Sequence, residues 1–328
     1  MNITVLAAGA WGTALALVFA GRHRVTLWAR EADLLQDMAR DQENKRFLPG
    51  FPFPEGLQLE ADLPRAVSQA QLLLIATPIA GLRPSLEALR QLEVATPVLW
   101  VCKGFEAGTG KLPHEVFDEF LPGVSNGVLS GPSFAQEVAA GQPTAITLAS
   151  RDVDFARATA QQLHGGHLRL YASCDLVGAE VGGAVKNILA IATGVCDGLH
   201  LGLNARAALI TRGLAEIARL GVALGGHKET FMGLAGVGDL ILTCTGDLSR
   251  NRQVGLGLAA GKSLERVLTD LGHVAEGVPT ALEVHRLAGR MGVDMPITAA
   301  VVAVLQGRMQ ARAAVEQLLA RDPRDEGC

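Results

Sequence analysis

Two lysines lie in apolar surroundings where a charged side chain could do chemistry. Lysine accounts for only 6 of the 29 Lys and Arg residues, so Lys186 and Lys103 are informative. Lys186 lies in the apolar, small-residue run 180–190, where burial would lower its pKa towards a range useful for proton transfer. Gly182 and Gly183 are costly inside a helix, which predicts close approach of another group to its backbone. We predict that Lys186 transfers a proton; the alternative is a lysine whose stem packs on the helix while its ammonium reaches solvent.

A glycine-rich segment and a short polar run could complete a site around these lysines. The segment 233–240 contains Asp239, and an aspartate at a helix start can orient a catalytic lysine. Further along, Ser249, Arg250 and Asn251 supply hydroxyl, guanidinium and amide donors, which suit a small phosphate ester. For Ser249 the simpler alternative is a helix N-cap.

The segment 7–12 occupies the place of a G-x-G-x-x-G dinucleotide fingerprint between a strand and a helix. Gly9 would let the backbone approach a pyrophosphate, and Gly12 would let the helix pack close to the strand. The helix N-terminus would present free N–H groups to the anion. Ala7 replaces the first glycine of the pattern, at the position that makes the tight turn.

Arg30 and Glu31 follow the second predicted strand, at the position that reads the adenosine ribose in dinucleotide-binding folds. An arginine can pair with a 2′-phosphate, whereas an acidic residue would bond the 2′-hydroxyl and repel phosphate. Arg30 therefore favours NADP. The alternatives are a solvated Arg30 and a ribose bound by Glu31.

Strand-like and helix-like segments alternate through the first half of the chain, which predicts a doubly wound, mostly parallel sheet. The run 72–76 is continuously apolar, as expected for a central strand covered on both faces. Lys103 directly follows another such run, at the carboxyl edge where open α/β sheets bind ligands. The predicted strands are Ile3–Leu6, Val25–Trp28, Leu72–Ala76, Val98–Val101, Gly127–Ser130 and Ala145–Leu148.

After about Tyr171 the pattern becomes helical, and bounded β-branched runs almost disappear. We therefore predict a Rossmann-like dinucleotide-binding domain of residues 1–175 and an all-helical domain of residues 176–328 that carries the substrate site. An apolar stripe in the second domain steps by three or four residues, which predicts a buried helix face. The stripe consists of Leu203, Ala207, Ile210, Leu214, Ile217 and Leu220.

Composition and charge exclude several classes of binding partner. The net charge is −4 and no block of like charge occurs, so nucleic acid is not an expected partner. The apolar stretch 72–80 is far below the ~18 residues of a spanning helix, so membrane insertion is not expected. His164 and His167 lack a nearby acidic or thiol partner, so no metal site is expected. The scattered cysteines suit reduced thiols in the cytoplasm: Cys102, Cys174, Cys196, Cys244 and Cys328.

Six blocks occur along the chain: G-A-W-G-T-A-L-A (9–16), G-P-S-F-A (131–135), V-K-N (185–187), G-V-G-D-L (236–240), S-R-N-R (249–252) and E-G (276–277). Together, and in this order, they resemble the bacterial-type NAD(P)-dependent glycerol-3-phosphate dehydrogenases. The blocks cover nearly the whole chain. The main departure is Ala7, which stands where the family usually has a glycine.

The resemblance implies a Rossmann-like sheet domain followed by a helical domain, as in 6-phosphogluconate dehydrogenase. It implies reversible hydride transfer between the nicotinamide C4 and C2 of dihydroxyacetone phosphate, with NADP or NAD as cofactor. The product would be sn-glycerol 3-phosphate for phospholipid synthesis. The resemblance also leaves room for a homodimer.

By the same resemblance, Lys186 is the proton donor in reduction and the base in oxidation, with Asp239 beside it. The implied substrate pocket consists of Lys103, Gly131, Ser133, Lys186, Asp239, Ser249, Arg250 and Asn251. The implied cofactor contacts are Gly9, Ala10, Trp11, Gly12, Arg30, Lys103, Ala135, Arg250, Val274 and Glu276.

Two other functions stay open from the sequence. A related two-domain reductase could act on a hydroxy acid, but it would lack the Ser249-Arg250-Asn251 grip on a phosphate. A nicotinamide-binding sensor without turnover would suit the degenerate fingerprint. The presence of both Lys186 and Asp239 argues against such a sensor.

Overall fold

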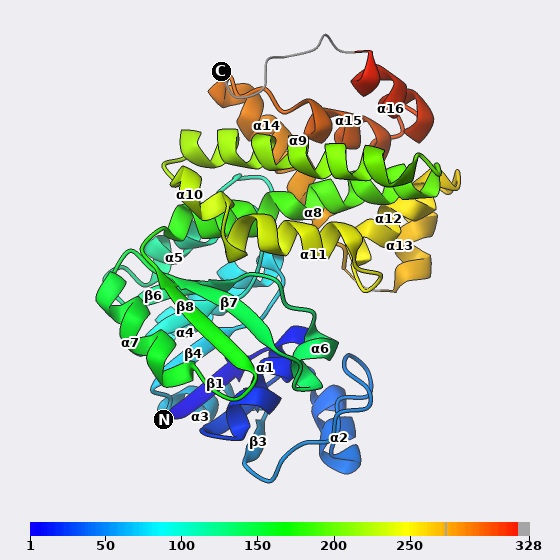
Figure 1. Cartoon of the computed structure of the whole chain (residues 1–328). Helices are drawn as coiled ribbons and strands as arrows, with labels where there is room; N and C mark the ends of the chain where they lie inside the picture. Colours follow the sequence, from blue (N-terminus) through cyan, green and yellow to red (C-terminus); the bar gives the residue numbers. More distant parts are fainter. Residues whose placement is uncertain (273, 321–328) are drawn as a thin grey trace.

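The computed structural model describes residues 1–272 and 274–320, so the chain end with Cys328 lies outside the described residues. One half of the molecule is a sheet with helices on both faces, and the other half is a stack of helices (Figure 1). The strands of the described residues are β1 (Asn2–Leu6), β2 (Arg24–Trp28), β3 (Leu57–Glu60), β4 (Leu72–Ile75), β5 (Val98–Trp100), β6 (Asn126–Ser130), β7 (Thr144–Ala149) and β8 (Leu168–Ser173).

These strands form one sheet in the order β3-β2-β1-β4-β5-β6-β7-β8. Neighbouring strands run parallel except β6 and β7, which are antiparallel. Ile3 in β1 pairs with Val25 of β2 on one side and with Leu72 of β4 on the other. The chain order reverses between β1 and β4, and at such a switch point open α/β sheets bind ligands beyond the carboxyl ends of their strands. The predicted doubly wound, mostly parallel sheet is confirmed.

Helices cover both faces of this sheet. One apolar cluster joins the sheet to α1, α2 and α7 around Phe19 and Met38, and a second joins it to α4, α5 and the start of α8 around Trp100 and Phe117. Every residue of β4 is buried, as the continuous apolar run predicts. The helices of this half are α1 (Ala10–Ala20), α2 (Ala32–Asp41), α3 (Leu63–Ser68), η1 (Ile79–Gly81), α4 (Leu82–Gln91), α5 (Pro113–Phe120), α6 (Ala135–Ala139) and α7 (Val153–Leu163).

The second half is built around α8, in which residues 178–196 are all buried. Figure 1 shows α9, α11 and α12 alongside it. The helices are α8 (Leu176–Gly198), α9 (Gly202–Ala223), α10 (Lys228–Phe231), the π-helical turn η2 (Leu234–Gly238), α11 (Asp239–Thr245), α12 (Arg250–Ala259), α13 (Leu264–Leu271), α14 (Gly277–Met291), α15 (Pro296–Leu305) and α16 (Ala311–Leu319). The predicted change from alternating to helical structure is confirmed, while the division into domains 1–175 and 176–328 stays a prediction.

Helix α8 is also long and apolar enough to cross a bilayer by length and composition, and 89% of its apolar window is buried inside the protein. The stretch 72–80 is therefore not the longest apolar segment of the chain. Burial by neighbouring helices on all sides accounts for the composition of α8, because a helix apolar all round is a core helix or a membrane span.

The structure differs from the sequence predictions at three elements. β3 and β8 lie at the two edges of the sheet and were not predicted. In β8, Leu168 and Leu170 are buried while Arg169 and Tyr171 are exposed, an alternation typical of a half-covered strand. The stripe along α9 is buried only in its later part.

Within that stripe Ile217 and Leu220 are fully buried, but Leu203 is 70% exposed and Ala207 is also exposed. The prediction of one continuous core stripe is wrong for the first half of α9. Helical periodicity sets the direction in which a stripe points, but it does not determine how far the neighbouring helices extend.

Candidate active site

Lys186 projects from the middle of α8 into the interior, where its side chain is 7% exposed. Its Nζ donates hydrogen bonds to Oδ1 of Asp239 and, at 2.9 Å, to Oγ1 of Thr243. Both partners come from α11, and Asp239 itself is 1% exposed. The alternative in which Lys186 reaches solvent is therefore wrong, since the ammonium is buried and paired.

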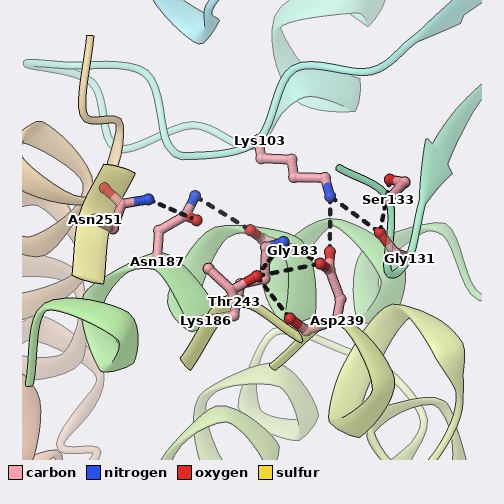
Figure 2. A network of polar contacts seen from close by, with 9 residues as sticks. All are labelled: Lys103, Gly131, Ser133, Gly183, Lys186, Asn187, Asp239, Thr243 and Asn251. Atoms are coloured by element: carbon pink, nitrogen blue, oxygen red, sulfur yellow. Dashed lines mark hydrogen bonds and ion pairs between the residues drawn. The ribbon is translucent and has the colours of Figure 1, made fainter. Parts of the chain in front are cut away.

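Lys103 contacts the other oxygen of the same carboxylate. Its Nζ lies 2.7 Å from Asp239 Oδ2 and 3.4 Å from the carbonyl oxygen of Gly131, which also accepts a hydrogen bond from Ser133 Oγ at 3.0 Å. Lys103 follows β5 and Gly131 follows β6, so the carboxyl edge of the sheet meets the helical half here. Figure 2 shows Lys103 and Lys186 converging on Asp239, with Gly131 and Ser133 beside Lys103.

Burial and charge act against each other in this cluster. Burial and, to a smaller extent, the Lys103 ammonium lower the pKa of Lys186, the Asp239 carboxylate opposes both effects, and the net result is a pKa of about 7. Burial alone would raise the pKa of Asp239, but the ammonium groups of Lys103 and Lys186 hold it below its usual range. The cluster thus combines an ionised carboxylate with a lysine that can exchange a proton near neutral pH.

Two glycines of α8 make this convergence sterically feasible. A Cβ at Gly182 would overlap the carbonyl oxygen of Ala235 in η2, and a Cβ at Gly183 would lie 2.9 Å from Oγ of Ser130. The helix can approach both η2 and the end of β6 only because these positions lack side chains. The predicted close approach to the α8 backbone is confirmed, and the approaching groups belong to the protein itself.

The polar network continues along α8 through two asparagines. Asn251 donates from Nδ2 to Asn187 Oδ1 at 3.0 Å, and its Oδ1 accepts from the backbone N–H of Gly277 at 2.9 Å. Asn187 in turn contacts the carbonyl oxygen of Gly183 at 3.5 Å. Asn251 is therefore joined through Asn187 to the helix that carries Lys186 (Figure 2).

Ser249 and Arg250 are placed differently from Asn251. Ser249 is the N-cap of α12, since its Oγ accepts from the N–H of Arg252 at 3.2 Å. Arg250 is exposed and makes no ion pair with any residue in the described ranges. The positive charge of Arg250 also affects the pKa of Glu276. Burial raises that pKa, and the positive charges of Arg250 and Lys103 oppose the rise.

Two residues of the network, Thr243 and Asn187, were given no role from the sequence. Thr243 lies four residues after Asp239 and therefore on the same face of α11, where it accepts from Lys186 and donates to the Asp239 carbonyl at 2.7 Å. Asn187 follows Lys186 directly. The four-residue spacing was the available signal for Thr243, whereas only the fold brings Asn187 to Asn251.

The fingerprint segment forms the turn between β1 and α1 at the switch point of the sheet. Gly9 is the N-cap of α1, no side chain caps that end, and its first turn has no acidic residue. A Cβ at Gly9 would meet no atom within 4 Å, whereas one at Gly12 would overlap the carbonyl oxygen of Ala7. An open glycine before an uncapped helix N-terminus fits the pyrophosphate of a dinucleotide.

Ala7 has φ +90°, a backbone conformation that favours glycine. Its N–H donates to the carbonyl oxygen of Trp28 at 2.9 Å, so the turn keeps the path expected of a fingerprint glycine. The alanine therefore accommodates the tight turn at the expense of backbone strain.

The remaining predicted cofactor contacts lie around this turn or at the rim of the site. Ala10 and Trp11 begin α1 and pack beside Ala135, which begins α6. Arg30 follows β2 with 82% of its side chain exposed and lies 3.3 Å from Glu31 Oε1. Val274 is 54% exposed.

The chain matches two family models in sequence. Residues 2–156 match the N-terminal part of NAD-dependent glycerol-3-phosphate dehydrogenase, and residues 175–316 match its C-terminal part. The glycerol-3-phosphate dehydrogenase [NAD(P)+] of Dechloromonas aromatica (strain RCB) is 66% identical over 327 residues, covering 99% of each chain. That of Aromatoleum aromaticum is 60% identical over 328 residues, covering 99% of this chain and 100% of the relative.

Among solved structures, the crystal structure of glycerol-3-phosphate dehydrogenase from Coxiella burnetii superimposes with a TM-score of 0.94 at 43% identity. The match covers 98% of this chain and 99% of that chain. The agreement extends over both the sheet and the helical half. The chain therefore belongs to the NAD-dependent glycerol-3-phosphate dehydrogenase family.

Proposed function

We propose that this chain is an oxidoreductase that interconverts dihydroxyacetone phosphate and sn-glycerol 3-phosphate with NADP or NAD. The observation that carries this proposal is the buried cluster of Lys103, Asp239 and Lys186, at the carboxyl edge of a dinucleotide-type sheet. Membership of the family supports the reaction, and the cluster supplies the chemistry that it needs.

Lys186 is the proton-transfer residue in this proposal. An ammonium has three N–H donors, and Asp239 and Thr243 accept two of them. The third is free to donate to the carbonyl oxygen of the ketone, stabilising the alkoxide as it forms and then giving it the proton. NADPH or NADH, when bound, supplies the hydride to C2. In the oxidative direction neutral Lys186 takes the proton back from the hydroxyl.

Asp239 and Lys103 prepare Lys186 for this role. The carboxylate orients the ammonium through a direct hydrogen bond and opposes the lowering of its pKa by burial. Lys103, which is 16% exposed on its side chain, adds a second positive charge to the substrate side of the cluster. Two cations around one carboxylate leave a net positive charge that favours an anionic substrate.

The phosphate grip is the second part of the proposal. Arg250 is exposed and free of ion pairs within the described part of the chain, so its guanidinium can pair bidentately with a phosphate. Asn251 follows it on α12, and the Ser249 hydroxyl keeps its proton for donation while its oxygen caps the helix. Gly131 and Ser133 line the opposite side, next to Lys103.

The proposed dinucleotide contacts lie around the switch point of the sheet, between β1 and β4. The pyrophosphate would lie at Gly9 to Gly12 over the N-terminus of α1, with Ala10, Trp11 and Ala135 beside it. Arg30 would pair with a ribose 2′-phosphate, and Val274 and Glu276 would face the nicotinamide end together with Lys103 and Arg250.

The wider setting of the reaction is also a proposal. The product would serve phospholipid synthesis, and the protein would act in the cytoplasm, where the thiols of the described cysteines stay unpaired. The partner is a small phosphate ester, and the chain could pair with a second copy.

A steady-state assay of purified protein tests the proposed reaction. We expect NADPH oxidation when dihydroxyacetone phosphate is added, and no comparable rate with dihydroxyacetone, which lacks the phosphate, or with a 2-keto acid. A faster rate with the keto acid would replace the proposal by a hydroxy-acid reductase. Dinucleotide binding without turnover on any of these ketones would favour a sensor.

A further inference from the structure

Three buried polar side chains meet between the sheet and α8. The Oε1 atom of Glu180 accepts from the indole N–H of Trp100 at 2.9 Å and from the backbone N–H of His114 at 3.0 Å. Its Oε2 atom hydrogen bonds with Nδ1 of His114. Trp100 belongs to β5, His114 to α5 and Glu180 to α8, and their exposed fractions are 0%, 5% and 4%. One carboxylate thus joins the sheet half to the helical half.

A buried carboxylate is a costly way to stabilise a fold. Well-packed apolar groups of similar volume often serve stability equally well, because a buried charge loses its hydration. Burial raises the pKa of Glu180. Burial alone would lower the pKa of His114, but its hydrogen bond to Glu180 raises it. Unlike apolar packing, these hydrogen bonds fix the relative position of the elements that they join, since each one holds a donor at a defined distance and angle from its acceptor.

The elements joined by Glu180 are those that carry the two lysines of the active site. Trp100 ends β5 shortly before Lys103, and Glu180 lies less than two turns before Lys186 on α8. A shift of α8 against β5 would change the separation of the two ammonium groups and their shared contact with Asp239.

We infer that Glu180 is a positioning residue that fixes α8 against β5 and thereby sets the geometry of the lysine pair. The inference rests on the proposed roles of Lys103 and Lys186. It adds a residue that touches neither substrate nor dinucleotide and acts only through the elements that carry those lysines.

Two substitutions at Glu180 distinguish the effect of its hydrogen bonds from the effect of its packing. Glu180→Met keeps the length of the side chain and removes every hydrogen bond, so we expect kcat to fall about tenfold or more through misplacement of the reacting groups. The KM for NADPH should change little, because the dinucleotide turn lies at β1 and α1. Glu180→Gln keeps an oxygen for Trp100 and the His114 N–H and offers an amide N–H to Nδ1, so kcat should stay within about threefold of wild type.

Glu216 offers a matched control in the same half of the molecule. It is 1% exposed on α9, and its carboxylate accepts from the backbone N–H groups of Ile297 at 2.6 Å and Thr298 at 3.1 Å at the start of α15. Glu216→Met therefore removes an equally buried carboxylate that does not join α8 to the sheet. We expect it to lower the melting temperature while leaving kcat and its pH midpoint unchanged.

The pH profile of dihydroxyacetone phosphate reduction distinguishes positioning from general destabilisation. Support consists of a reduced kcat and a displaced pH midpoint in Glu180→Met, near-normal values in Glu180→Gln, and an unmoved midpoint in Glu216→Met. A folded Glu180→Met protein with wild-type kcat and midpoint would overturn the inference, as would equal displacement in Glu216→Met. If Glu180→Met does not fold, Trp100→Phe, which removes the indole donor to Glu180, takes its place as the test. An unchanged kcat and pH midpoint in Trp100→Phe would then overturn the inference.

Lys186→Met is measured beside these variants. If that protein is active, the proposed mechanism itself fails. If it is inactive while Glu180→Met matches wild type, only the positioning role of Glu180 fails.

Discussion

Lys103 and Lys186 contact opposite oxygens of one carboxylate, that of Asp239, although one lysine follows a strand of the sheet and the other lies in the core helix of the second half. Two ammonium groups and one carboxylate carry a net positive charge in a site that is largely shielded from water. Such a site can stabilise a developing alkoxide next to a phosphate ester, and the pKa of Lys186, about 7, suits the proposed proton donor.

Replacement of Lys186 tests the proton donor directly. Lys186→Ala should lower kcat by about 10²- to 10⁴-fold, because general acid–base groups contribute on this scale. Dinucleotide binding, measured by fluorescence titration, should persist because the proposed pyrophosphate site is formed by the turn before α1, whereas Lys186 lies in α8. Unchanged turnover would remove Lys186 from the mechanism.

The two directions of the reaction should respond oppositely to pH. Burial, the largest effect, and Lys103 lower the pKa of Lys186 to about 7, with Asp239, Glu276 and Cys244 as the other titratable groups facing it. Ketone reduction needs the ammonium, so its kcat/KM should fall as pH rises through about 7. Alcohol oxidation needs the neutral amine, so its kcat/KM should rise over the same interval. Parallel profiles in the two directions would argue against a single titrating lysine.

The hydroxyl of Thr243 should matter although no role was assigned to it from the sequence. Thr243→Val keeps the shape of the side chain and removes the acceptor for the Lys186 ammonium. A hydrogen bond to a charged group contributes about 1.5–3 kcal/mol, so we expect kcat to fall roughly tenfold to a hundredfold. Thr245→Val is the matched control, because Thr245 is exposed on the same helix and donates only to the Ile241 carbonyl. Equal effects of the two substitutions would show that the helix, rather than the contact, was perturbed.

Arg30 should set the preference between the two nicotinamide cofactors. Its exposed guanidinium follows β2, and Arg30→Asp would place a negative charge where the 2′-phosphate of NADPH is expected. The ratio of kcat/KM for NADPH to that for NADH should drop about tenfold or more, equivalent to about 1.4 kcal/mol. The measurement is steady-state kinetics with both cofactors in parallel. An unaltered ratio would show that the ribose is recognised elsewhere.

Ala7 should be a position where glycine stabilises the protein. At φ +90° an L-residue is strained, so Ala7→Gly should raise stability by about 1 kcal/mol despite the greater freedom of glycine in the unfolded chain. Gly12→Ala is the contrasting variant, because its Cβ would overlap the Ala7 carbonyl oxygen, and it should lower stability. Thermal denaturation of wild type, Ala7→Gly and Gly12→Ala gives the order of their stabilities. A lower melting temperature for Ala7→Gly than for wild type would contradict the proposed strain at Ala7.

Several features followed from local patterns in the sequence. The continuous apolar run of β4 and the alternation of short strands with helices were enough for a doubly wound sheet, because both are properties of the chain within a few residues. Lys186 was distinguished by its apolar neighbours, and Gly182 and Gly183 indicated close packing. The edge strands β3 and β8 were missed because L-Q-L-E and L-R-L-Y alternate apolar with polar residues, a weaker signal than the continuous apolar run of a strand covered on both faces.

Tertiary structure alone decided which side chains share an environment. Lys103, Lys186 and Asp239 are far apart in the chain, and their pKa values depend on burial and on one another, so no local pattern contains them. The same holds for Glu180, because its hydrogen-bond partners on β5 and α5 are brought to α8 only by the fold. The sequence determined which groups could do chemistry, and long-range packing determined which of them meet, because burial and distance set the energy of every charge in the site.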